Sequence, residues 1–240
     1  MAQSIVADFH CHTLASSHAY STVAEVARQA AAMGLLAVGC TDHGIGIEDA
    51  PHLWHFLNLR ILPPYIDGVR VLRGVEANVM DFTGRLDMPE EAFQRLELVI
   101  ASMHEGVMPQ GSREEHTAAW LGVAANPRVD IIGHSGAPCF AYDYEEVIPV
   151  FGRMGKVVEI NENTFAVREH YLPNCRRIAQ LCMRHGVRVA VDSDAHYHSL
   201  VGRADRSLAM LREIGFPDEL IVNASAENLR AYLEEKHITL

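Results

Sequence analysis

The sequence predicts an α/β fold, a parallel β/α barrel of the TIM type with outer helices, in a single domain spanning residues 1–240. Short β-branched runs alternate along the chain with longer helix-like segments. The runs are mostly apolar throughout, as expected for parallel strands that are buried on both faces. About seven such β-α units in a chain of 240 residues favour a barrel, with an open doubly wound sheet as the alternative.

Each unit begins with one of the apolar runs. The predicted strands are Ile5–Cys11, Leu35–Thr41, Val69–Glu76, Leu98–Ser102, Ile131–His134, Val157–Asn161 and Arg188–Asp192. The first helix is expected to open at a capping box formed by Thr22 and Glu25, to run to Met33 and to stop at Gly34. Further helices are predicted over 89–96, 113–124, 143–153, 171–185, 199–213 and 225–236. The stretch 44–68, rich in Pro, His and aromatic residues, is predicted to be a loop that carries a short helix.

Composition excludes several classes of protein. With 31 acidic and 20 basic residues the formal net charge is −11, which disfavours a nucleic-acid partner because phosphate backbones need clustered Lys and Arg. No apolar run approaches the ~18 residues of a membrane helix, and no signal-peptide pattern opens the chain, so we expect no membrane partner. Five cysteines without a CxxC pair indicate reduced thiols and a cytoplasmic protein.

The 14 histidines are an excess that points to bound metal.

Many of these histidines lie at the ends of predicted strands, where the active sites of barrels are built. His10 and His12 close the first strand, and side chains two apart on a strand point to one face. Asp194 and His196 follow the last strand with the same spacing. The nine candidate metal ligands are His10, His12, His18, His43, Glu76, His104, His134, Asp194 and His196.

Imidazole and carboxylate are ligands of zinc and, with less preference, of manganese or iron. Nine groups exceed what one tetrahedral ion can use, so we expect several ions, with Glu76 as the natural bridge between two of them. Paired metals generate a hydroxide at neutral pH and would make a positive pocket that attracts a dianionic phosphate. We assign Glu76, Asp194 and His12 as the candidate catalytic residues of this centre.

The motifs that carry these residues resemble the PHP (polymerase and histidinol phosphatase) family. They are DFHCHT at 8–13, TDHG at 41–44, RGVEAN at 73–78, MHE at 103–105, GHSG at 133–136 and SDAH at 193–196. The flanking segments SSHAYST, DHGIGIEDAPHLWHF and LRGVEANV resemble a bacterial phosphatase branch of that family. His18 stands where many members have Asp, and this departure also favours that branch.

The resemblance implies an irregular (βα)7 barrel with three zinc ions at the C-terminal ends of the strands, with manganese or iron as alternatives. It implies a first zinc on His10, His12, Glu76 and Asp194. A second zinc would be held by Glu76, His104 and His134. The third would be held by His18, His43 and His196.

The function predicted from this site is hydrolysis of phosphate monoesters, in which a metal-bridging hydroxide attacks phosphorus in line. The expected partner is a small phosphorylated substrate, and a homo-oligomer is left open. The alternative is a PHP-type nuclease that cleaves phosphodiesters of single-stranded nucleic acid, which the absence of a basic groove disfavours. A third hypothesis, a non-enzymatic protein with a relic site, is disfavoured because all nine positions hold competent ligands.

Five other residues are weaker candidates. Asp42 is predicted either to orient His43 or to cap the end of its strand. His52 and His55, in the 44–68 loop, either face the substrate or pack within the loop. Arg60 and Arg73 are candidates for holding phosphate, because guanidinium matches phosphate oxygens in a fork, with a structural role as the alternative for each.

Overall fold

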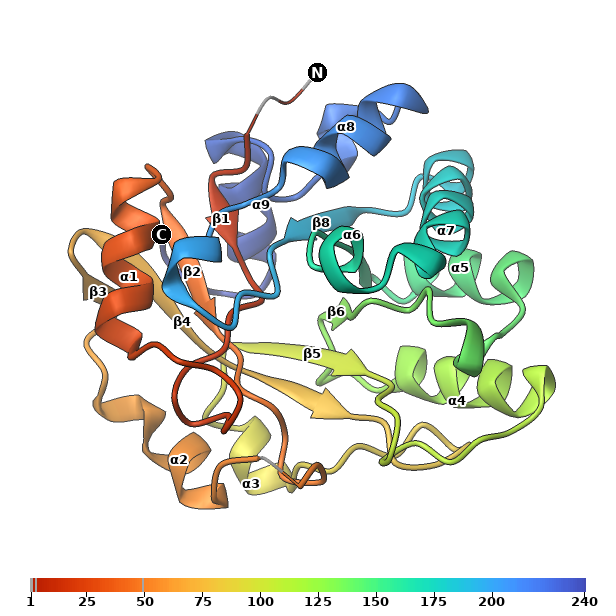
Figure 1. The fold of residues 1–240 in the computed structure, drawn as a ribbon, viewed down its shortest axis with the longest axis horizontal. Helices are drawn as coiled ribbons and strands as arrows, with labels where there is room; N and C mark the ends of the chain where they lie inside the picture. Colours follow the sequence, from red (N-terminus) through yellow and green to blue (C-terminus); the bar gives the residue numbers. More distant parts are fainter. Residues whose placement is uncertain (1, 3, 49) are drawn as a thin grey trace.

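Parallel strands form the centre of the molecule. The computed structural model describes residue 2, residues 4–48 and residues 50–240. Within these residues, seven parallel strands lie in the order β1-β2-β4-β5-β6-β7-β8, and a short strand, β3 (Tyr65–Ile66), pairs antiparallel with β4 (Figure 1). The parallel strands are β1 (Ala7–Asp8), β2 (Ala37–Cys40), β4 (Val69–Asn78), β5 (Leu98–Ser102), β6 (Ile131–Ile132), β7 (Val157–Asn161) and β8 (Val189–Asp192).

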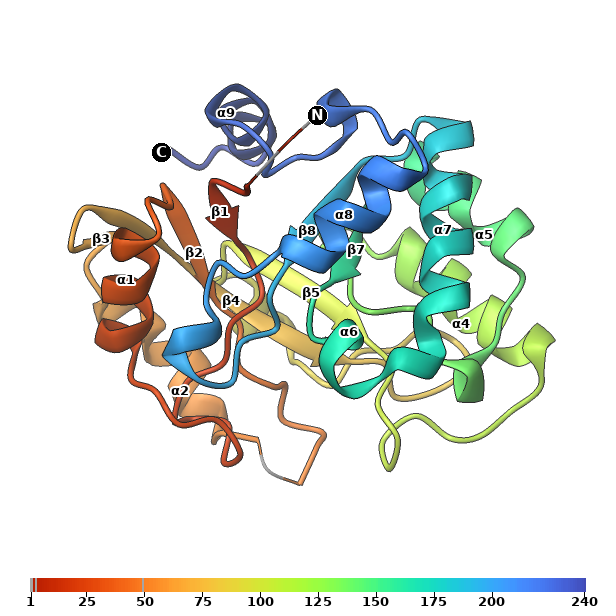
Figure 2. The same ribbon diagram turned by 45° about the horizontal axis from the view of Figure 1, so that its top comes forward.

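The edge strands β1 and β8 approach each other and nearly close the sheet (Figures 1 and 2). Beyond the strand ends, Cys11 and Ala195 form a parallel bridge. The buried side chain of Asn223 joins the same two strands, because its Nδ2 donates to the carbonyl oxygens of Ala7 at 2.8 Å and of Val191 at 2.7 Å. The predicted barrel is therefore confirmed, and the open doubly wound sheet is wrong.

Helices surround the barrel (Figure 1). Strands that follow each other in the sequence are neighbours in the sheet, and most are joined by a segment that carries a helix, as parallel pairing requires. The α-helices are α1 (Val23–Ala32), α2 (Leu53–Asn58), α3 (Glu90–Phe93), α4 (Arg113–Ala125), α5 (Tyr144–Arg153), α6 (Thr164–Val167), α7 (Leu172–His185), α8 (Asp205–Glu213) and α9 (Ala226–Glu235). In the described part of the chain, we find no helix that combines the length and the apolar character of a membrane span.

Two apolar cores stabilise this arrangement. One fills the barrel near the start of the strands, where Phe9 packs against Tyr232 of α9 with 5.6 Å between the ring centroids. The other lies between the outward faces of the strands and the helices, and it includes Val38 and Val75. Because α9 and its apolar side chains close the N-terminal end of the barrel, polar side chains inside the barrel gather at the C-terminal end.

The predicted start and stop of the first helix are confirmed. The backbone N–H of Glu25 donates to Thr22 Oγ1 at 3.2 Å, and the N–H of Thr22 donates to Glu25 Oε2 at 2.7 Å. Helix α1 ends at Ala32, and Gly34 follows with φ of +74°, a conformation that glycine adopts without strain. Local residue chemistry was sufficient to place this element.

The single helix predicted over 199–213 is wrong. The chain instead forms a 3₁₀ turn, η4 (His198–Leu200), and starts α8 only at Asp205. Between them Gly202 has φ of +78°, and its N–H donates to Asp8 Oδ2 in the barrel at 2.8 Å. The hydrogen bond to Asp8, a residue far away in the sequence, therefore interrupts a helical pattern that appears continuous in the sequence alone.

The stretch 44–68 contains the predicted short helix, α2, which continues into a 3₁₀ turn, η1 (Leu59–Ile61). Strand β3 then returns the chain to the sheet. The side chains of Trp54 and Ile61 are more than 70% exposed. The part of the segment that forms α2 and η1 packs on the outside of the barrel, where Phe56 and Leu59 are buried in the core between strands and helices.

Candidate metal centre

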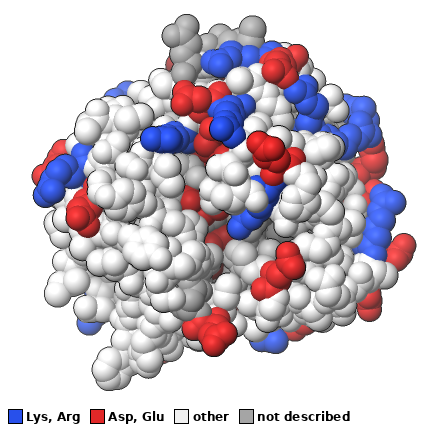
Figure 3. Space-filling view, in the orientation of Figure 1, with Lys and Arg blue, Asp and Glu red and all other residues white. Residues whose placement is uncertain are grey.

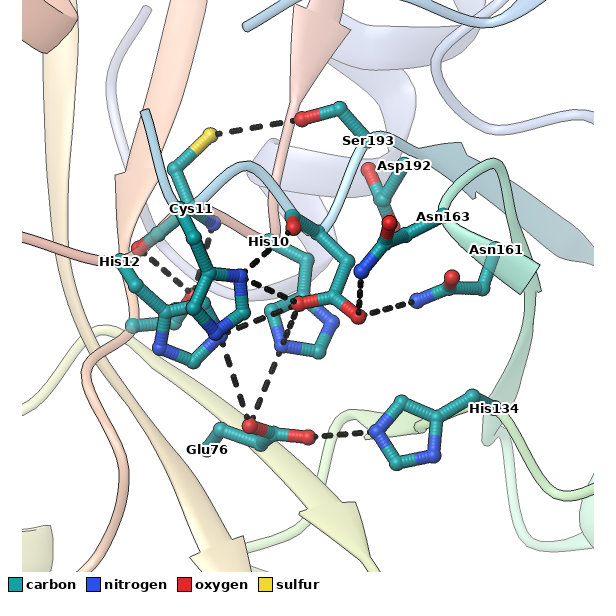
Figure 4. A network of polar contacts seen from close by, with 12 residues as sticks. His10, Cys11, His12, Glu76, His134, Asn161, Asn163, Asp192 and Ser193 are labelled. Carbon is teal, nitrogen blue, oxygen red and sulfur yellow. Dashed lines mark hydrogen bonds and ion pairs between the residues drawn. The ribbon is translucent and has the colours of Figure 1, made fainter. Parts of the chain in front are cut away.

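The carboxylate of Glu76, on β4, lies between imidazoles from several strand ends (Figure 4). Its Oε1 is 2.8 Å from His134 Nε2 and 3.3 Å from His104 Nε2. Its Oε2 is 3.3 Å from His10 Nε2 and 2.9 Å from His43 Nδ1. The two oxygens of one buried carboxylate thus face different groups of histidines.

A second carboxylate, Asp194, follows β8. Its Oδ1 is 3.3 Å from His12 Nε2, which is also 3.5 Å from Glu76 Oε2. The backbone of Asp194 has φ of +54°, a left-handed conformation that few residues other than glycine adopt and that is frequent at functional sites. The side-chain amides of Asn161 and Asn163 donate to its Oδ2 at 3.2 Å and 3.4 Å. These contacts hold the carboxylate in the cluster.

His18 reaches the cluster from the loop after β1. Its ring stacks on that of His196 with a centroid distance of 4.4 Å and on that of His43 at 5.2 Å. His196 in turn stacks on His12 at 4.2 Å. All nine side chains predicted as ligands are therefore brought together at the C-terminal end of the barrel.

The donor atoms of this cluster fit a bound metal. The following ligand atoms are buried and have no hydrogen-bond partner among the described residues: His10 Nε2, His12 Nε2, Glu76 Oε2 and His196 Nε2. Such atoms are rare in folded proteins unless an ion or water satisfies them. Three overlapping sets place their ligand atoms within 4.8 Å of one another: His12, His43 and His196; His10, His12 and Glu76; His43, Glu76 and His104. Nitrogen and carboxylate oxygen donors at this spacing suit zinc or a similar divalent ion.

The electrostatics of the cluster also favour cations. Burial alone would raise the pKa of Glu76, but His10 and other neighbouring histidines outweigh it and hold this pKa well below its usual value. Asp194 behaves in the same way, because His10 and His12 lower its pKa against the effect of burial. Burial lowers the pKa of His12 to about 3. The carboxylates are thus ionised and His12 is neutral, the states in which they bind metals. Burial alone would lower the pKa of His10, but the negative charges of Glu159 and Glu76 outweigh it and raise this pKa well above its usual value, so a metal ion that binds there would displace a proton from His10.

Acceptors behind the cluster orient three of its imidazoles. His10 Nδ1 lies 2.6 Å from Glu159 Oε1, and His104 Nδ1 lies 2.7 Å from Asn78 Oδ1. His196 Nδ1 lies 3.0 Å from the carbonyl oxygen of Asp194. Glu159 and Asn78 were not among the residues predicted from the sequence, although both carry a signal. Glu159 is a single acid within an apolar strand, and Asn78 lies two residues after Glu76 and hence on the same face of β4.

Asp42 holds the loop that follows β1. Its carboxylate accepts from the backbone N–H of Thr13 at 2.7 Å and from Ser16 Oγ at 2.8 Å. Ser16 Oγ accepts in turn from the N–H of His43 at 3.1 Å, so Asp42 reaches His43 through Ser16. His55 Nε2, on α2, is 3.1 Å from Asp42 Oδ2. These contacts support the prediction that Asp42 caps a strand end, and they place His55 against the back of the site.

The other candidates of the 44–68 loop and β4 have structural contacts. His52 caps α2, because its Nδ1 accepts from the N–H of Trp54 at 3.1 Å. Arg73 Nε is 2.9 Å from Glu97 Oε2 on the outside of the barrel. Arg60 is exposed in the turn η1 and does not line the cavity at the cluster. A phosphate-holding role for Arg60 or Arg73 is therefore wrong for this cavity.

A cavity of about 240 Å³ opens beside the cluster. Beyond the histidines and carboxylates, its wall includes Ile47, Met103, Ala137, Phe140, Arg168 and Tyr171. Arg168 Nη1 is buried without a hydrogen-bond partner among the described residues and lies 3.7 Å from Asp194 Oδ2. Arg168 was not predicted from the sequence, because nothing in the residues around it indicates that the segment after β7 turns back over the site.

The charged side chains on the face shown in Figure 3 are scattered. Blue lysine and arginine side chains alternate with red acidic ones, and the lower left of this face carries few charges of either sign. Nucleic-acid backbones bind to continuous basic stripes. This face offers no such stripe among the residues that the view shows.

Comparisons with known proteins agree with the fold and the motifs. The PHP domain family model matches residues 8–166. A probable phosphatase of Acetivibrio thermocellus is 45% identical over 231 residues, which cover 96% of each chain. A second probable phosphatase, from Clostridium novyi, is 43% identical over 96% of this chain and 95% of its own.

A similar solved structure is that of the histidinol phosphate phosphatase from Lactococcus lactis, complexed with zinc, L-histidinol and phosphate. It superposes with a TM-score of 0.61 at 17% identity and covers 90% of this chain and 95% of its own. At that identity the likeness shows a shared fold. The family match over most of the chain and the relatives above 40% identity together show that this protein belongs to the PHP domain family.

Proposed function

We propose that the protein is a phosphatase that hydrolyses phosphate monoesters at a cluster of divalent metal ions. The observation that carries the proposal is the pair of buried, ionised carboxylates, Glu76 and Asp194, surrounded by imidazoles. Three of the imidazole nitrogens, His10 Nε2, His12 Nε2 and His196 Nε2, are buried without a hydrogen-bond partner among the described residues. Membership of the PHP family, and relatives that are named as probable phosphatases, support the same class of hydrolase. Zinc in the related fold from L. lactis supports a metal cofactor.

Three zinc ions are proposed, with manganese or iron as alternatives at one or more positions. The proposed ligand sets are His10, His12, Glu76 and Asp194 for the first ion, Glu76, His104 and His134 for the second, and His18, His43 and His196 for the third. The two oxygens of Glu76 support a bridging role for this residue, because Oε1 faces His104 and His134 while Oε2 faces His10 and His43. When bound, such ions ionise a water molecule near neutral pH and neutralise charge on the phosphoryl oxygens.

The cavity supports a small monoester as the substrate. A volume of about 240 Å³ accommodates a phosphoryl group and a small organic group. Arg168 presents a guanidinium on the cavity wall, where it would pair with phosphoryl oxygens that the ions leave uncovered. Apolar side chains such as Phe140 and Met103 would contact the organic part of the ester. No observation on the described residues favours the nuclease alternative.

Removal of the metal tests the proposal. Treatment with a strong chelator should abolish hydrolysis of p-nitrophenyl phosphate, and added zinc should restore it, because the cluster alone supplies the groups that activate water. Elemental analysis of the active protein should find bound divalent metal. Full activity in protein shown to be free of transition metal would refute the proposal. Faster cleavage of bis(p-nitrophenyl) phosphate or of single-stranded DNA than of the monoester would replace it with the nuclease.

Replacing Arg168 by methionine should reduce kcat/KM for p-nitrophenyl phosphate by about 10- to 100-fold. The reason is the loss of charge-assisted hydrogen bonds to the phosphoryl group, worth about 1.5–3 kcal/mol. Steady-state kinetics on zinc-loaded protein measures the effect, and Arg168→Lys should retain part of the lost activity. Arg60→Met removes an exposed arginine outside the cavity and serves as the matched control. Equal kcat/KM for both methionine variants would show that Arg168 does not bind the substrate.

A further inference from the structure

Glu159 is a buried acid in the middle of β7 that the proposed reaction does not use directly. Its side chain is fully buried, and a carboxylate at that depth is stable only if it is hydrogen-bonded. Both of its oxygens have short contacts. Oε1 is 2.6 Å from His10 Nδ1, and Oε2 accepts from the backbone N–H of His134 at 2.6 Å. Oε2 also accepts from Asn161 Nδ2 at 3.2 Å.

The first contact determines how His10 presents its ring. Because the other oxygen of Glu159 already accepts from a backbone N–H, we assign Oε1 as the acceptor and the Nδ1–H of His10 as the donor of the 2.6 Å contact. The opposite nitrogen, Nε2, then points at the two carboxylates of the cluster, 3.3 Å from Glu76 Oε2 and 3.8 Å from Asp194 Oδ1. This is the arrangement in which a carboxylate behind a histidine orients it toward a metal.

The second contact holds a segment that the sheet does not hold. Strand β6 pairs with its neighbours only at Ile131 and Ile132, so His134 lies beyond the ladder. Glu159 anchors the backbone of His134 there. The Nε2 atom of His134 lies 2.8 Å from Glu76 Oε1. The rings of His10 and His134 stack with a centroid distance of 6.0 Å and an angle of 20° between their planes. One carboxylate thus positions the imidazoles of His10 and His134, which are far apart in the sequence and both approach Glu76.

We infer that Glu159 is a positioning residue of the proposed metal centre, which fixes the tautomer of His10 and the backbone of His134 so that both direct Nε2 at the ions. It acts through these two histidines and does not touch the substrate. The inference rests on the proposed function, and it adds a residue outside the nine proposed ligands on which metal affinity depends.

Glu159→Gln tests the inference with little change in volume. Glutamine has one accepting oxygen and one donating amide, so it cannot accept from both His10 Nδ1 and the N–H of His134. We expect zinc affinity to fall by about 10- to 100-fold, the usual effect of removing such a partner. Competition with a chromophoric zinc chelator measures the affinity. At saturating zinc, kcat should recover more fully than it does at limiting zinc.

The matched control is Asp130→Asn, which alters a largely buried carboxylate at the other end of the barrel. Asp130 accepts from the N–H of Val99 at 2.8 Å and pairs with Lys236. This variant should unfold at a lower urea concentration than the wild type and should bind zinc with unchanged affinity. Equal losses of zinc affinity in both variants would assign the effect to general destabilisation and would overturn the inference.

A measurement on the zinc-loaded wild type decides the matter even if Glu159→Gln does not fold. Nitrogen-15 NMR of labelled histidines should show a proton on Nδ1 of His10 and no proton on Nε2. The resonances of His10 are identified by their absence in His10→Gln. Protonation on Nε2 would overturn the positioning role. Wild-type protein that binds no zinc would overturn the proposed function as well. Wild-type affinity in folded Glu159→Gln would overturn the positioning role alone.

Discussion

Glu76→Gln should reduce hydrolysis of p-nitrophenyl phosphate below detection and strip metal from the centre. Glu76 is fully buried, and its two oxygens face four imidazoles within 3.3 Å. Glutamine removes the negative charge and turns an amide N–H₂ toward one group of histidines, so that one side of the proposed bridge can no longer bind a cation. The expected result is a loss of both kcat and bound zinc, measured by steady-state kinetics and by elemental analysis of the purified variant.

His12→Ala provides an independent route to the same result. His12 Nε2 lies between the two carboxylates, and its removal opens the cluster without changing either acid. A suitable control is Glu97→Gln, because Glu97 pairs with Arg70 and Arg73 on the outside of the barrel. The control should lose stability but keep its metal and its kcat. Retained activity in both Glu76→Gln and His12→Ala would contradict the assignment of the centre.

Gly39→Ala should destabilise the fold by about 3 kcal/mol, the upper end of the cost of overpacking. A Cβ at Gly39 would lie 2.2 Å from the carbonyl oxygen of Phe9, and backbone atoms cannot rotate away as a side chain can. Gly39 lies in β2 opposite β1, so this close approach is what brings His10 and His43 to the same cluster. Urea unfolding of the metal-free protein measures the change in the free energy of unfolding.

Gly155→Ala is the matched control for that substitution. Gly155 has φ of +70° and nothing within 4 Å of the added Cβ, so its cost is backbone strain alone, about 1 kcal/mol. An effect of Gly39→Ala no larger than that of Gly155→Ala would show that β1 and β2 can separate without penalty. In that case the close packing of β1 and β2 would not be what positions His10 and His43.

Much of the centre could be predicted because its residues follow from local patterns. A parallel strand directs alternate side chains to one face, and the C-terminal ends of all strands in a barrel meet at one end. The spacing of His10 and His12, and of Asp194 and His196, was therefore informative without any tertiary contact. The capping box at Thr22 is local in the same sense, since its two hydrogen bonds join residues three apart.

Other features had no local signal. Arg168 reaches the cavity because the segment after β7 turns back over the site. The predicted helix over 199–213 is interrupted at Gly202, because the N–H of Gly202 donates a hydrogen bond to Asp8 Oδ2. Asn223 closes the barrel by joining two strands that lie near opposite ends of the chain. None of these partners can be inferred from neighbours in the sequence.

The amino-acid sequence by itself determined which side chains could bind metal and on which strand ends they lie, because strand periodicity and residue chemistry are local properties. Only the tertiary structure decided which acceptor stands behind each imidazole, as Glu159 does for His10. The tertiary structure also decided which basic side chain, Arg168, faces the cavity. Those choices depend on the packing of segments that are distant in sequence, and their physical cause is the mutual burial of groups that no local pattern brings together.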